Sequence, residues 1–434
     1  MTQKSMPQFL IAAPMSGSGK TTVSRGLMAL FRSKGYAVQP FKCGPDYIDT
    51  KFHEAVCGRP SINLDTFMAS EQHVVQLYAR YAAGADACVV EGMMGLFDGY
   101  DRDRGSTAHV ARVLNLPVVL VVDARSAAYS MAALLSGFLH FNKEMQIVGV
   151  IFNRVGSARH RDMLRQVCDD LRLSCYGMLP RCEQLEQGSR YLGLDFSQVD
   201  DAAGMLELME QHIDWKRLLQ DTLLPAPSAA EPQPPLPLRV CIARNAESFS
   251  FLYQETIDRF ASVSFFDPET QVPWLEDTDL LYLPGGYPEK HLPELSLAAD
   301  TRSAIADYAR RGGRIVAECG GMMYLCRDIL TDSAEGAVAF PMCGVLPYSI
   351  TACRNDRRLS LGYRRFSVAG NDYRGHEFHY SQFLGTPPPT AFAVTDARGN
   401  LVGTPVIRQG NVLASYTHLY WGGPDVMKLF QERL

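Results

Sequence analysis

Several features that would place a chain in a special class are scarce or missing here. There is no Cys-x-x-Cys pair, and the 11 cysteines are odd in number and scattered, which is typical of reduced thiols rather than of a disulfide framework. No run approaches the roughly 20 apolar residues that a membrane-spanning helix needs. The N-terminus also lacks an apolar core of signal-peptide length. We therefore expect a soluble, cytoplasmic protein with no membrane partner.

Neither sign of charge is in large excess. The formal net charge is −5, and charged residues make up 21% of the chain. This balance argues against nucleic acid as the main partner, but it leaves room for a local basic pocket that binds an anionic small molecule. The hydrophobic fraction of 47% is enough for ordinary globular cores, and the length of 434 residues predicts two or three domains.

A change in composition divides the chain. The stretch Asp221–Arg239, DTLLPAPSAAEPQPPLPLR, is rich in proline and alanine and has neither helical nor strand periodicity. Such a segment stays extended and solvated, so residues 221–238 are predicted to be a linker between a first domain at 1–220 and a second at 239–434. A long loop inside one domain is the alternative interpretation.

Short apolar runs alternate with helix-like stretches on both sides of this linker. That alternation predicts parallel βαβ units, so we expect two α/β domains, each with a mostly parallel sheet flanked by helices. Residues 362–393 look richer in strands. The predicted strands are 9–13, 37–41, 87–91, 118–123, 147–153, 239–243, 262–266, 280–284 and 314–318, and helices are predicted at 21–34 and 107–114.

The segment AAPMSGSGKTT lies between a predicted strand and a predicted helix. It fits the phosphate-binding loop Gly-x₄-Gly-Lys-Ser/Thr, except that Pro14 stands where the first glycine belongs. The glycines allow a tight turn whose backbone N–H groups face phosphate, the lysine reaches the β- and γ-phosphates, and the following threonine is a ligand for Mg²⁺. The predicted nucleotide-binding residues here are Gly17, Gly19, Lys20, Thr21 and Thr22.

Acidic residues follow two other predicted strands of the first domain. Asp46 and Asp49 lie in FKCGPDYIDTKFH, and Glu91 ends the run ACVVE. Because parallel strands end at one edge of a sheet, these carboxylates are placed for a magnesium or substrate site beside the phosphate loop. Lys42 shares the first of these loops and is a candidate phosphoryl contact. For Asp98, function and a role in a turn remain equally open.

The second domain contains a candidate nucleophile. In RIVAECGGMMYL, Cys319 lies between a β-branched strand and a predicted helix, which is the arrangement of a nucleophile elbow. We expect the helix N-terminus to lower the pKa of the Cys319 thiol. Backbone N–H groups of Gly286, in YLPGGYPE, and of Gly320 are the predicted oxyanion hole.

A thiol nucleophile needs a base. The candidates in the same domain are four histidines: His291, His376, His379 and His418. His418 follows a strand-like run in NVLASYTHLYW and is the preferred base. The remaining cysteines are expected to be buried, inert thiols.

The combination of motifs is more specific than any one of them. In order along nearly the whole chain stand SGSGKTT, FKCGPDYIDTKFH, GRPSINLDTFM, VVEGMMGLFDGY, GSTAHVARVL, PVVLVVDAR, GVIFNRV, YLPGGYPE, AECGGMMYL, RGHEFHYS and GNVLASYTHLYW. Together they resemble the cobyrinic acid a,c-diamide synthase family of cobalamin biosynthesis, in which a dethiobiotin-synthetase-like P-loop domain is fused to a class I type glutamine amidotransferase domain. Members use glutamine, ATP and Mg²⁺ to amidate the a- and c-carboxylates of a corrinoid.

The resemblance implies a role for each matching residue. Asp49 would act near the acceptor carboxylate, Asn153 in GVIFNRV would contact the adenine edge, and Cys319 and His418 would form the glutaminase pair. The residues that would bind ATP and Mg²⁺ are Lys20, Thr21, Asp46 and Glu91, with Thr21, Asp46 and Glu91 as the metal ligands. Many amidotransferases carry His-x-Glu, but here Tyr420 stands where the acid belongs. Glu377, in RGHEFHYS, is the candidate substitute.

Other functions stay open at this stage. Relatives in the same reaction class act on hydrogenobyrinic acid or on a nickel-containing sirohydrochlorin, and cobyric acid synthase shares the same parts. From a different class, a P-loop switch ATPase could carry an amidotransferase-like module that only binds. An intact Cys319–His418 pair argues for the enzyme. The expected partners are small molecules, with a second copy of the chain as the one macromolecular partner left open.

Overall fold

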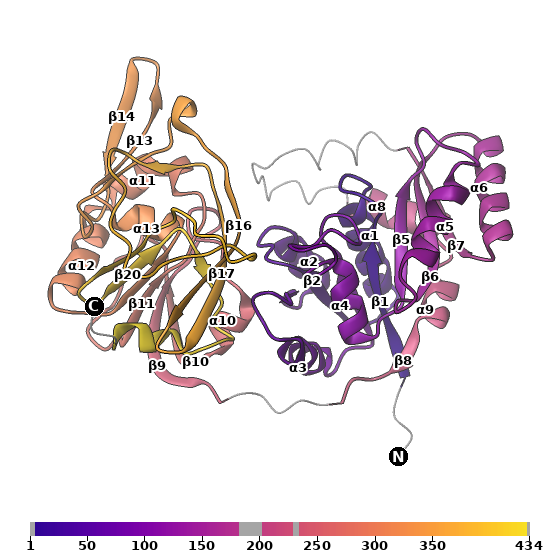
Figure 1. The fold of residues 1–434 in the computed structure, drawn as a ribbon, viewed down its shortest axis with the longest axis horizontal. Coiled ribbons are helices and arrows are strands. Elements are labelled where there is room, and N and C mark those ends of the chain that lie inside the picture. Colours follow the sequence, from indigo (N-terminus) through magenta and orange to yellow (C-terminus); the bar gives the residue numbers. More distant parts are fainter. Residues whose placement is uncertain (1–4, 182–201, 229–233, 432–434) are drawn as a thin grey trace. The chain divides into compact units, whose positions relative to one another are not determined.

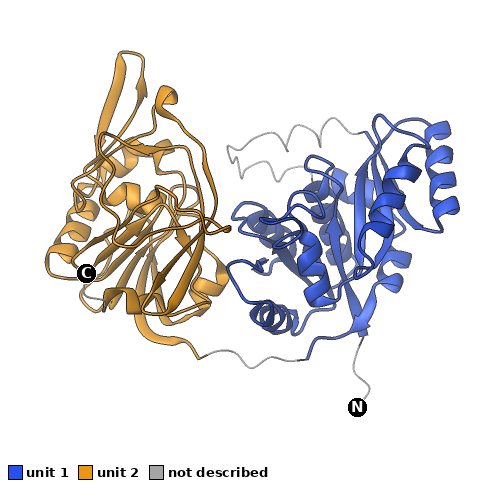
Figure 2. Ribbon diagram, viewed as in Figure 1, with its two compact units in different colours: residues 1–232 blue, residues 233–434 orange. Residues whose placement is uncertain are grey.

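The computed structural model describes residues 5–181, 202–228 and 234–431. The chain divides into two compact units, residues 1–232 and residues 233–434, which Figure 2 colours separately. Each unit has its own sheets and its own buried hydrophobic core. Each therefore has the internal packing that an independent folding unit requires.

Strands and helices alternate along the first unit (Figure 1). Its described strands are β1 Ser5–Ala12, β2 Val38–Cys43, β3 Ile62–Leu64, β4 Ala87–Glu91, β5 Val118–Asp123, β6 Ile147–Val155, β7 Ser174–Pro180 and β8 Leu223–Pro225. Its described helices are α1 Lys20–Ser33, α2 Asp49–Cys57, α3 Glu71–Ala82, α4 Thr107–Leu114, α5 Met131–Phe141, α6 Ala158–Leu171, α8 Ala202–His212 and α9 Trp215–Asp221.

The main sheet of this unit has the order β3-β2-β4-β1-β5-β6-β7, and each neighbouring pair is parallel. The expected α/β fold is confirmed. The strands β2 to β4 lie on one side of β1, and β5 to β7 lie on the other. Sheets of this type bind ligands at the carboxyl ends of the strands where the order reverses, which here is the end of β1.

The core explains why β1 and α1 form where they do. β1 is buried from its second residue onward, as expected for a strand covered on both faces. Phe9 and Ile11, on one face of β1, pack in one cluster with Val23, Leu27 and Leu30 of α1. The spacing of three and four residues places these three side chains on one side of the helix, so α1 docks on the sheet and fixes the loop before it.

The second unit begins with β9 (Figure 1). Its described strands are β9 Leu236–Ala243, β10 Phe260–Phe266, β11 Leu280–Leu283, β12 Ile315–Glu318, β13 Asp328–Ser333, β14 Gly336–Pro341, β15 Ser349–Thr351, β16 Ser360–Val368, β17 Asn371–His379, β18 Gln382–Phe383, β19 Val406–Gln409, β20 Val412–Ser415 and β21 His418–Leu419. Its described helices are α10 Gln254–Asp258, α11 Leu292–Leu297, α12 Ala299–Arg310, α13 Gly320–Leu325 and the short 3₁₀ helices η1 Pro288–Lys290, η2 Arg354–Asp356 and η3 Val426–Phe430.

The central sheet of the second unit separates two cores. Its order is β10-β9-β11-β12-β20-β19, and all neighbours are parallel except β19 and β20. Leu281 and Leu283 of β11 pack with the helical residue Ile305 on one face. Leu280 and Tyr282 pack with Phe366 of β16 on the other. The alternation along β11 therefore reflects helices on one face and a second sheet on the other.

That second sheet is the strand-rich stretch expected at 362–393. It has the order β16-β17-β21 with antiparallel pairs, and β21 contributes only two residues. Its middle strand β17 pairs His376 with His418 of β21. The short strand β21 is important because it fixes the backbone of the predicted base.

The predicted linker at 221–238 is too long at both ends. Leu223–Pro225 form β8, which pairs antiparallel with the start of β1, and Gln8 Nε2 donates to the Pro225 carbonyl at 2.9 Å. At the other end β9 begins at Leu236. A three-residue strand shows no periodicity, and the partner of β8 lies more than 200 residues away in the chain, so the composition of the segment did not reveal it.

The described cysteines, ten in all, are free thiols, and nine of them are buried. Helices long and apolar enough to cross a membrane are absent from the described part of the chain.

Candidate functional site

The loop between β1 and α1 has the backbone of an anion-binding turn. Gly17 and Gly19 have φ angles of 79° and 95°, which residues with a Cβ rarely adopt. A Cβ on Gly19 would lie 2.2 Å from Nδ2 of Asn153, so a larger residue does not fit. No side chain caps the start of α1, which leaves its first backbone N–H groups for a ligand.

A cavity of about 320 Å³ lies over this turn. The sequence named nine residues of the first domain for nucleotide or metal binding and Asp49 for catalysis, and all ten lie in the wall of this one cavity. They are Gly17, Gly19, Lys20, Thr21, Thr22, Lys42, Asp46, Asp49, Glu91 and Asn153. They come from the ends of four different strands and the starts of two helices, and the parallel order of the sheet brings those ends to one edge.

Lys42, Asp49 and Glu91 form a buried carboxylate–lysine cluster at the floor of the cavity. The ammonium Nζ of Lys42 lies 2.6 Å from Oδ2 of Asp49 and 2.9 Å from Oε1 of Glu91. Thr21 Oγ1 donates to the same Glu91 oxygen at 2.6 Å. Lys42 and Glu91 are 3% and 0% exposed, so their charges are stable only because they are paired.

The cluster sets the protonation of its members. Burial disfavours the charge on Lys42, but Glu91 and Asp49 outweigh burial and raise the pKa of Lys42 well above its usual value. Burial also opposes the charge of Glu91, yet Lys42 and His53 hold the pKa of Glu91 well below its usual range. For Asp49, burial prevails over Lys42 and raises the pKa to about 7. Asp49 is thus the carboxyl of this cluster whose pKa is raised and whose charge the site stabilises least.

Lys20 differs from Lys42 in its surroundings. Its Nζ donates to the carbonyl of Met94, whose own backbone has a positive φ of 49°. Burial and the neighbouring charge of Lys42 lower the pKa of Lys20. An added anion at this point would relieve both effects, as expected for a phosphate-binding lysine.

His53 is a part of this site that sequence reasoning missed. It lies on α2, is 0% exposed, and its Nε2 is 2.7 Å from Oε2 of Glu91. Its Nδ1 is 3.1 Å from Ser61 Oγ, which fixes the ring from the other side. Both Glu91 oxygens are therefore held, one by His53 and one by Lys42 and Thr21. A signal was available, because His53 follows Asp49 by one turn of an amphipathic helix.

The residues fit a magnesium ion that arrives with a nucleotide. In residues 5–181, 202–228 and 234–431, no three His, Cys, Asp or Glu side chains are grouped to hold a metal by themselves. Mg²⁺ needs few protein ligands when phosphate and water complete its shell. Thr21 Oγ1 and Glu91 Oε1, 2.6 Å apart, supply two adjacent oxygens. Asp46 uses Oδ1 to accept the Ile48 and Asp49 N–H groups, while its Oδ2 is 3.8 Å from Lys42.

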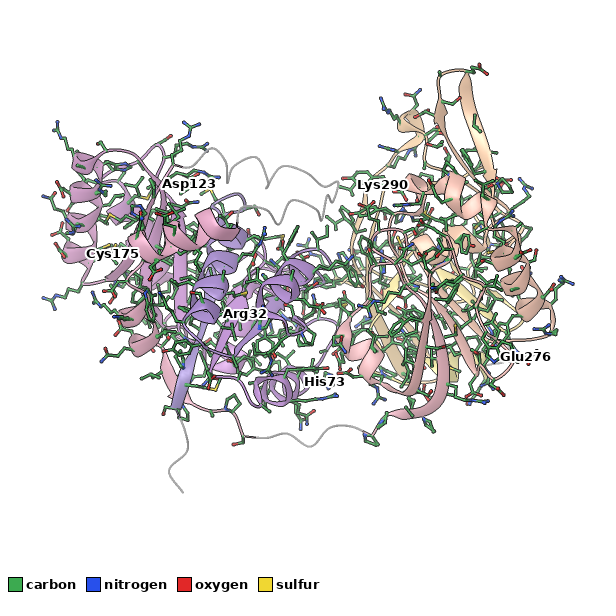
Figure 3. All side chains as sticks on the ribbon, turned by 180° about the vertical axis from the view of Figure 1, so that it is seen from behind. Arg32, His73, Asp123, Cys175, Glu276 and Lys290 are labelled. Atoms are coloured by element: carbon green, nitrogen blue, oxygen red, sulfur yellow. The ribbon has the colours of Figure 1, made fainter. Side chains whose placement is uncertain are left out.

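Two further residues hold the rim of the cavity. Asn153, at the end of β6, donates from Nδ2 to the Ser18 carbonyl at 3.0 Å, so it lies directly over the phosphate turn. Its neighbour Arg154 donates to the Gly17 carbonyl at 2.9 Å and to Asp123, labelled in Figure 3, at 2.7 Å.

The open question about Asp98 now has a structural answer. Its Oδ2 accepts the Gly95 backbone N–H at 2.9 Å, which is a turn contact, and Asp98 is not among the residues that line the cavity.

Cys319 of the second unit sits on a strained strand-to-helix turn. Its φ is 47° and its ψ is −108°, a conformation that costs free energy for a residue with a Cβ. The turn is held by a 2.7 Å bond from the Cys319 N–H to the Ser415 carbonyl, and Sγ lies 3.9 Å from the Phe378 carbonyl. The expectation of a lowered thiol pKa is wrong for this state: the side chain is 3% exposed, and burial raises the pKa of Cys319 far above its usual value.

His418 begins β21, three residues after the end of β20, the strand that pairs with β12. Gly285 makes room for it, because a Cβ there would lie 2.2 Å from Cε1 of the ring. Burial, with help from His376 and His379, lowers the pKa of His418 to about 3. The imidazole is therefore neutral at physiological pH, which is the form that accepts a proton.

The other histidine candidates have different partners. His291 lies 3.0 Å from Glu247 and 3.3 Å from Glu269. His379 is bonded to Glu377 at 2.8 Å and stacks on Tyr416.

The two glycines named for the oxyanion hole are neighbours. A Cβ on Gly320 would lie 3.1 Å from the backbone nitrogen of Gly286, so the two segments approach more closely than side chains allow. A Cβ on Gly286 would lie 2.3 Å from the Ser248 carbonyl. The structure therefore places both backbones beside Cys319, on the turn after β12 and the turn after β11.

Known proteins share both halves of this arrangement. Residues 9–192 match the CobQ/CobB/MinD/ParA nucleotide binding domain, and residues 245–426 match the CobB/CobQ-like glutamine amidotransferase domain. A Brucella abortus protein named hydrogenobyrinate a,c-diamide synthase is 41% identical, over 95% of this chain and 98% of its own length. The chain belongs to the a,c-diamide synthase family. Proteins of the same name from Streptomyces coelicolor and Mycobacterium bovis are 37% and 40% identical, over 97% and 85% of their lengths and 99% and 85% of this chain.

Membership in the a,c-diamide synthase family confirms the class expected from the motifs. The chain is a glutamine-dependent, amide-forming ligase whose first unit binds a nucleotide. The alternative of a switch ATPase with a module that only binds finds no support among these relatives.

Proposed function

We propose that this chain uses ATP, Mg²⁺ and glutamine to amidate the a- and c-carboxylates of a cobyrinate-type tetrapyrrole in cobalamin biosynthesis. The observation that carries the proposal is that one chain holds a phosphate turn with a carboxylate–lysine cluster and, in a separate unit, a cysteine elbow with a neutral histidine. The relatives named hydrogenobyrinate a,c-diamide synthase support hydrogenobyrinate as an acceptor. Cobyrinate is the acceptor that the resemblance of the motifs implies.

In the synthetase unit the acceptor carboxylate attacks the γ-phosphorus of ATP. The new bond joins a carboxylate oxygen to phosphorus, the bond to the ADP oxygen breaks, and an acyl phosphate results. Lys20 and the first N–H groups of α1 bind the phosphates of ATP. Asn153 lies at the rim of the cavity, where the adenine would bind. Thr21, Glu91 and Asp46 would hold Mg²⁺, which supplies positive charge to the transferring phosphoryl group. Ammonia then adds to the acyl carbon and phosphate leaves.

Asp49 has the properties of a group that acts on the acceptor. Its pKa of about 7 lets it bind the acceptor carboxylate as an acid or accept a proton from the attacking ammonia as a base. The Lys42 ammonium lies 2.6 Å from the Asp49 carboxyl group and stabilises negative charge on Asp49 or on the acceptor carboxylate.

In the glutaminase unit His418 accepts the thiol proton of Cys319, and the sulfur attacks the amide carbon of glutamine. The N–H groups of Gly286 and Gly320 bind the oxygen as it becomes negative. The carbon–nitrogen bond breaks, His418 returns its proton to the nitrogen, and ammonia leaves with a glutamyl thioester on Cys319. Water then adds to the carbonyl, the sulfur leaves with a proton, and glutamate is released.

The direct test offers the purified protein a panel of tetrapyrrole acids with ATP, Mg²⁺ and glutamine, and the products are weighed by mass spectrometry. The panel is cobyrinic acid, hydrogenobyrinic acid and nickel sirohydrochlorin. We expect a mass decrease of about 1 Da per amide formed, ending at the diamide of a cobyrinate-type acid. If the nickel compound alone is amidated, nickel sirohydrochlorin is the acceptor and the proposed acceptor is wrong. ATP hydrolysis with no amide on any acid would contradict the whole proposal.

A further inference from the structure

A cysteine–histidine pair works best when a third group orients the histidine and balances its charge. The one acid that the sequence offered for this task, Glu377, has other partners, and the usual position of the acid holds a tyrosine. Tyr420 takes the place of the usual acid, and its hydroxyl bonds to Glu255 at 2.5 Å. Glu377 bonds to His379 at 2.8 Å and to Arg364 at 2.6 Å.

Glu318 is a third buried acid, directly before Cys319 in the chain, and its carboxylate lies near His418. It is the last residue of β12, directly before Cys319, and is 2% exposed. Its Oε1 accepts the backbone N–H of Leu419 at 3.1 Å, and its Oε2 lies 3.9 Å from Nδ1 of His418. One carboxylate therefore contacts both residues of β21 while its own backbone leads into the nucleophile.

Two aromatic side chains fix this carboxylate in place. The Tyr282 hydroxyl donates to Oε2 at 2.7 Å from β11, and Trp421 Nε1 donates to Oε1 at 3.4 Å. Tyr282 and Trp421 also pack against one another, with ring centroids 5.4 Å apart. Both oxygens thus have fixed donors, so the carboxylate holds one orientation relative to the imidazole.

We propose that Glu318 is the positioning acid of the glutaminase site, which rests on the glutaminase half of the proposed function. Its carboxylate lies on the Nδ1 side of the His418 ring, 3.9 Å from Nδ1, so that Nε2 is the nitrogen that exchanges protons at the reacting centre. The proton moves from Cys319 Sγ to Nε2 and later from Nε2 to the departing nitrogen. Glu318 itself passes no proton to the substrate, but its negative charge stabilises the imidazolium between these two transfers.

The surroundings make the effect depend on pH. Burial raises the pKa of Glu318 to about 8, although Tyr282, Leu419 and Trp421 donate to the charged form. The titratable groups around Glu318, Cys319 and His418 are Tyr282, Glu289, His376, Glu377, His379 and Tyr416, and Arg364 pairs with Glu377. With Glu318 ionised above its pKa, the glutaminase kcat/KM should rise as the pH is raised through about 8.

The test compares Glu318→Gln with Glu377→Gln and Glu318→Asp in the full chain. Glutamate release from glutamine needs no acceptor, and ammonium-supported amide formation is measured in parallel. We expect Glu318→Gln to lower glutaminase kcat about 100-fold with the KM for glutamine within about twofold, and to remove the rise near pH 8. Glu318→Asp should keep the rise and restore part of the rate. Ammonium-supported synthesis should stay unchanged.

Glu377→Gln is the competing variant, since Glu377 is the other buried carboxylate of the site. It should keep the rise near pH 8 and lose less activity than Glu318→Gln. The inference is overturned if Glu318→Gln keeps glutaminase activity within about threefold of wild type, or if Glu377→Gln alone removes the pH rise. It is also overturned if Glu318→Gln loses ammonium-supported synthesis as well, because Glu318 would then be structural. Failure of every variant and wild type to form any amide would instead count against the proposed function.

Discussion

The two strand-to-helix turns described above differ in both backbone and chemistry: residues 13–19 connect β1 to α1, whereas Cys319 alone connects β12 to α13. After β1 the turn uses glycines for its positive φ angles, and it faces a cavity where Lys20, Lys42, Asp49 and Glu91 gather. After β12 the nucleophile itself takes the positive φ of 47°, and its partners are close to neutral. Burial raises the pKa of Cys319, lowers the pKa of His418 to about 3 and raises the pKa of Glu318 to about 8.

This contrast follows from what each turn must do. A phosphate arrives with several negative charges, so the first turn keeps fixed positive charge and paired carboxylates ready for it. Glutamine is uncharged at its amide, so the second turn keeps Cys319 and His418 neutral, and these two become charged only when the thiol proton moves. The first site should therefore respond most to loss of a charge, and the second to loss of a proton acceptor.

The largest effect should come from the charge of Lys20. In Lys20→Ala, amide formation should fall by about three orders of magnitude with either glutamine or ammonium as nitrogen source, because carboxylate activation precedes both. Product is measured by mass spectrometry at saturating ATP. Lys34→Ala, which removes an exposed lysine at the end of the same helix, is the matched control and should be near wild type. Near-normal synthesis by Lys20→Ala would show that the turn does not bind the reacting phosphates.

A smaller effect should separate Asp46 from Asp49. Asp46→Asn keeps the oxygen that accepts the Ile48 and Asp49 N–H groups, so α2 should still start correctly, while the requirement for Mg²⁺ or ATP should rise about tenfold. Asp49→Asn removes one of the two carboxylates that contact Lys42 and should mainly impair use of the tetrapyrrole or stop the reaction at the monoamide.

Titrations of ATP, Mg²⁺ and acceptor for both variants provide this measurement. Glu54→Gln, on the exposed side of α2, is the control. Identical defects in Asp46→Asn and Asp49→Asn would remove the basis for separate roles.

The smallest expected effect concerns stability in acid. The folded state lowers the pKa of His418 to about 3, whereas the pKa of histidine in the unfolded chain is near 6.5. The neutral His418 side chain therefore contributes its full stability above pH 6.5, and this contribution is lost as the pH falls toward 3. The loss for this one group is at most about 1.4 kcal/mol per pH unit. In His418→Gln the thermal midpoint should fall less than in wild type between pH 6.5 and 5. Equal slopes in the two proteins would show that His418 is not kept neutral by the fold.

Many of the strands can be predicted from the sequence, because the pattern that predicts each of them lies within a few consecutive residues. Buried parallel strands are continuous apolar runs, so the predicted strands 87–91 and 118–123 have the bounds seen in the fold. The three-residue strands β3 and β8 were missed, because a segment that short has no period and depends on a partner distant in the chain. The two-residue strand β21, which aligns His418 with His376, is another feature that only the folded chain supplies.

The sites divide in a similar way. Residues in a fixed spacing, such as Lys20 and Thr21, or at a strand end, such as Glu91, can be predicted from the sequence alone. The contacts of His53 and Glu318 depend on side chains that meet across the fold. His53 on α2 meets Glu91 on β4, and Glu318 on β12 meets His418 on β21. The helical spacing from Asp49 could have drawn attention to His53, but it does not identify Glu91 as its partner. The direction of the Cys319 pKa also depends on burial, which a glycine-rich motif does not reveal.

The central claim is that two separate turns supply two separable activities, and Cys319→Ala tests it most directly. Amide product is compared with glutamine and with ammonium salts at mildly alkaline pH, for wild type and Cys319→Ala. Cys326→Ala, a buried cysteine at the other end of α13, is the control. We predict that Cys319→Ala loses glutamine-dependent synthesis by several orders of magnitude while ammonium-dependent synthesis persists. Loss of both activities in a folded Cys319→Ala protein would contradict the account.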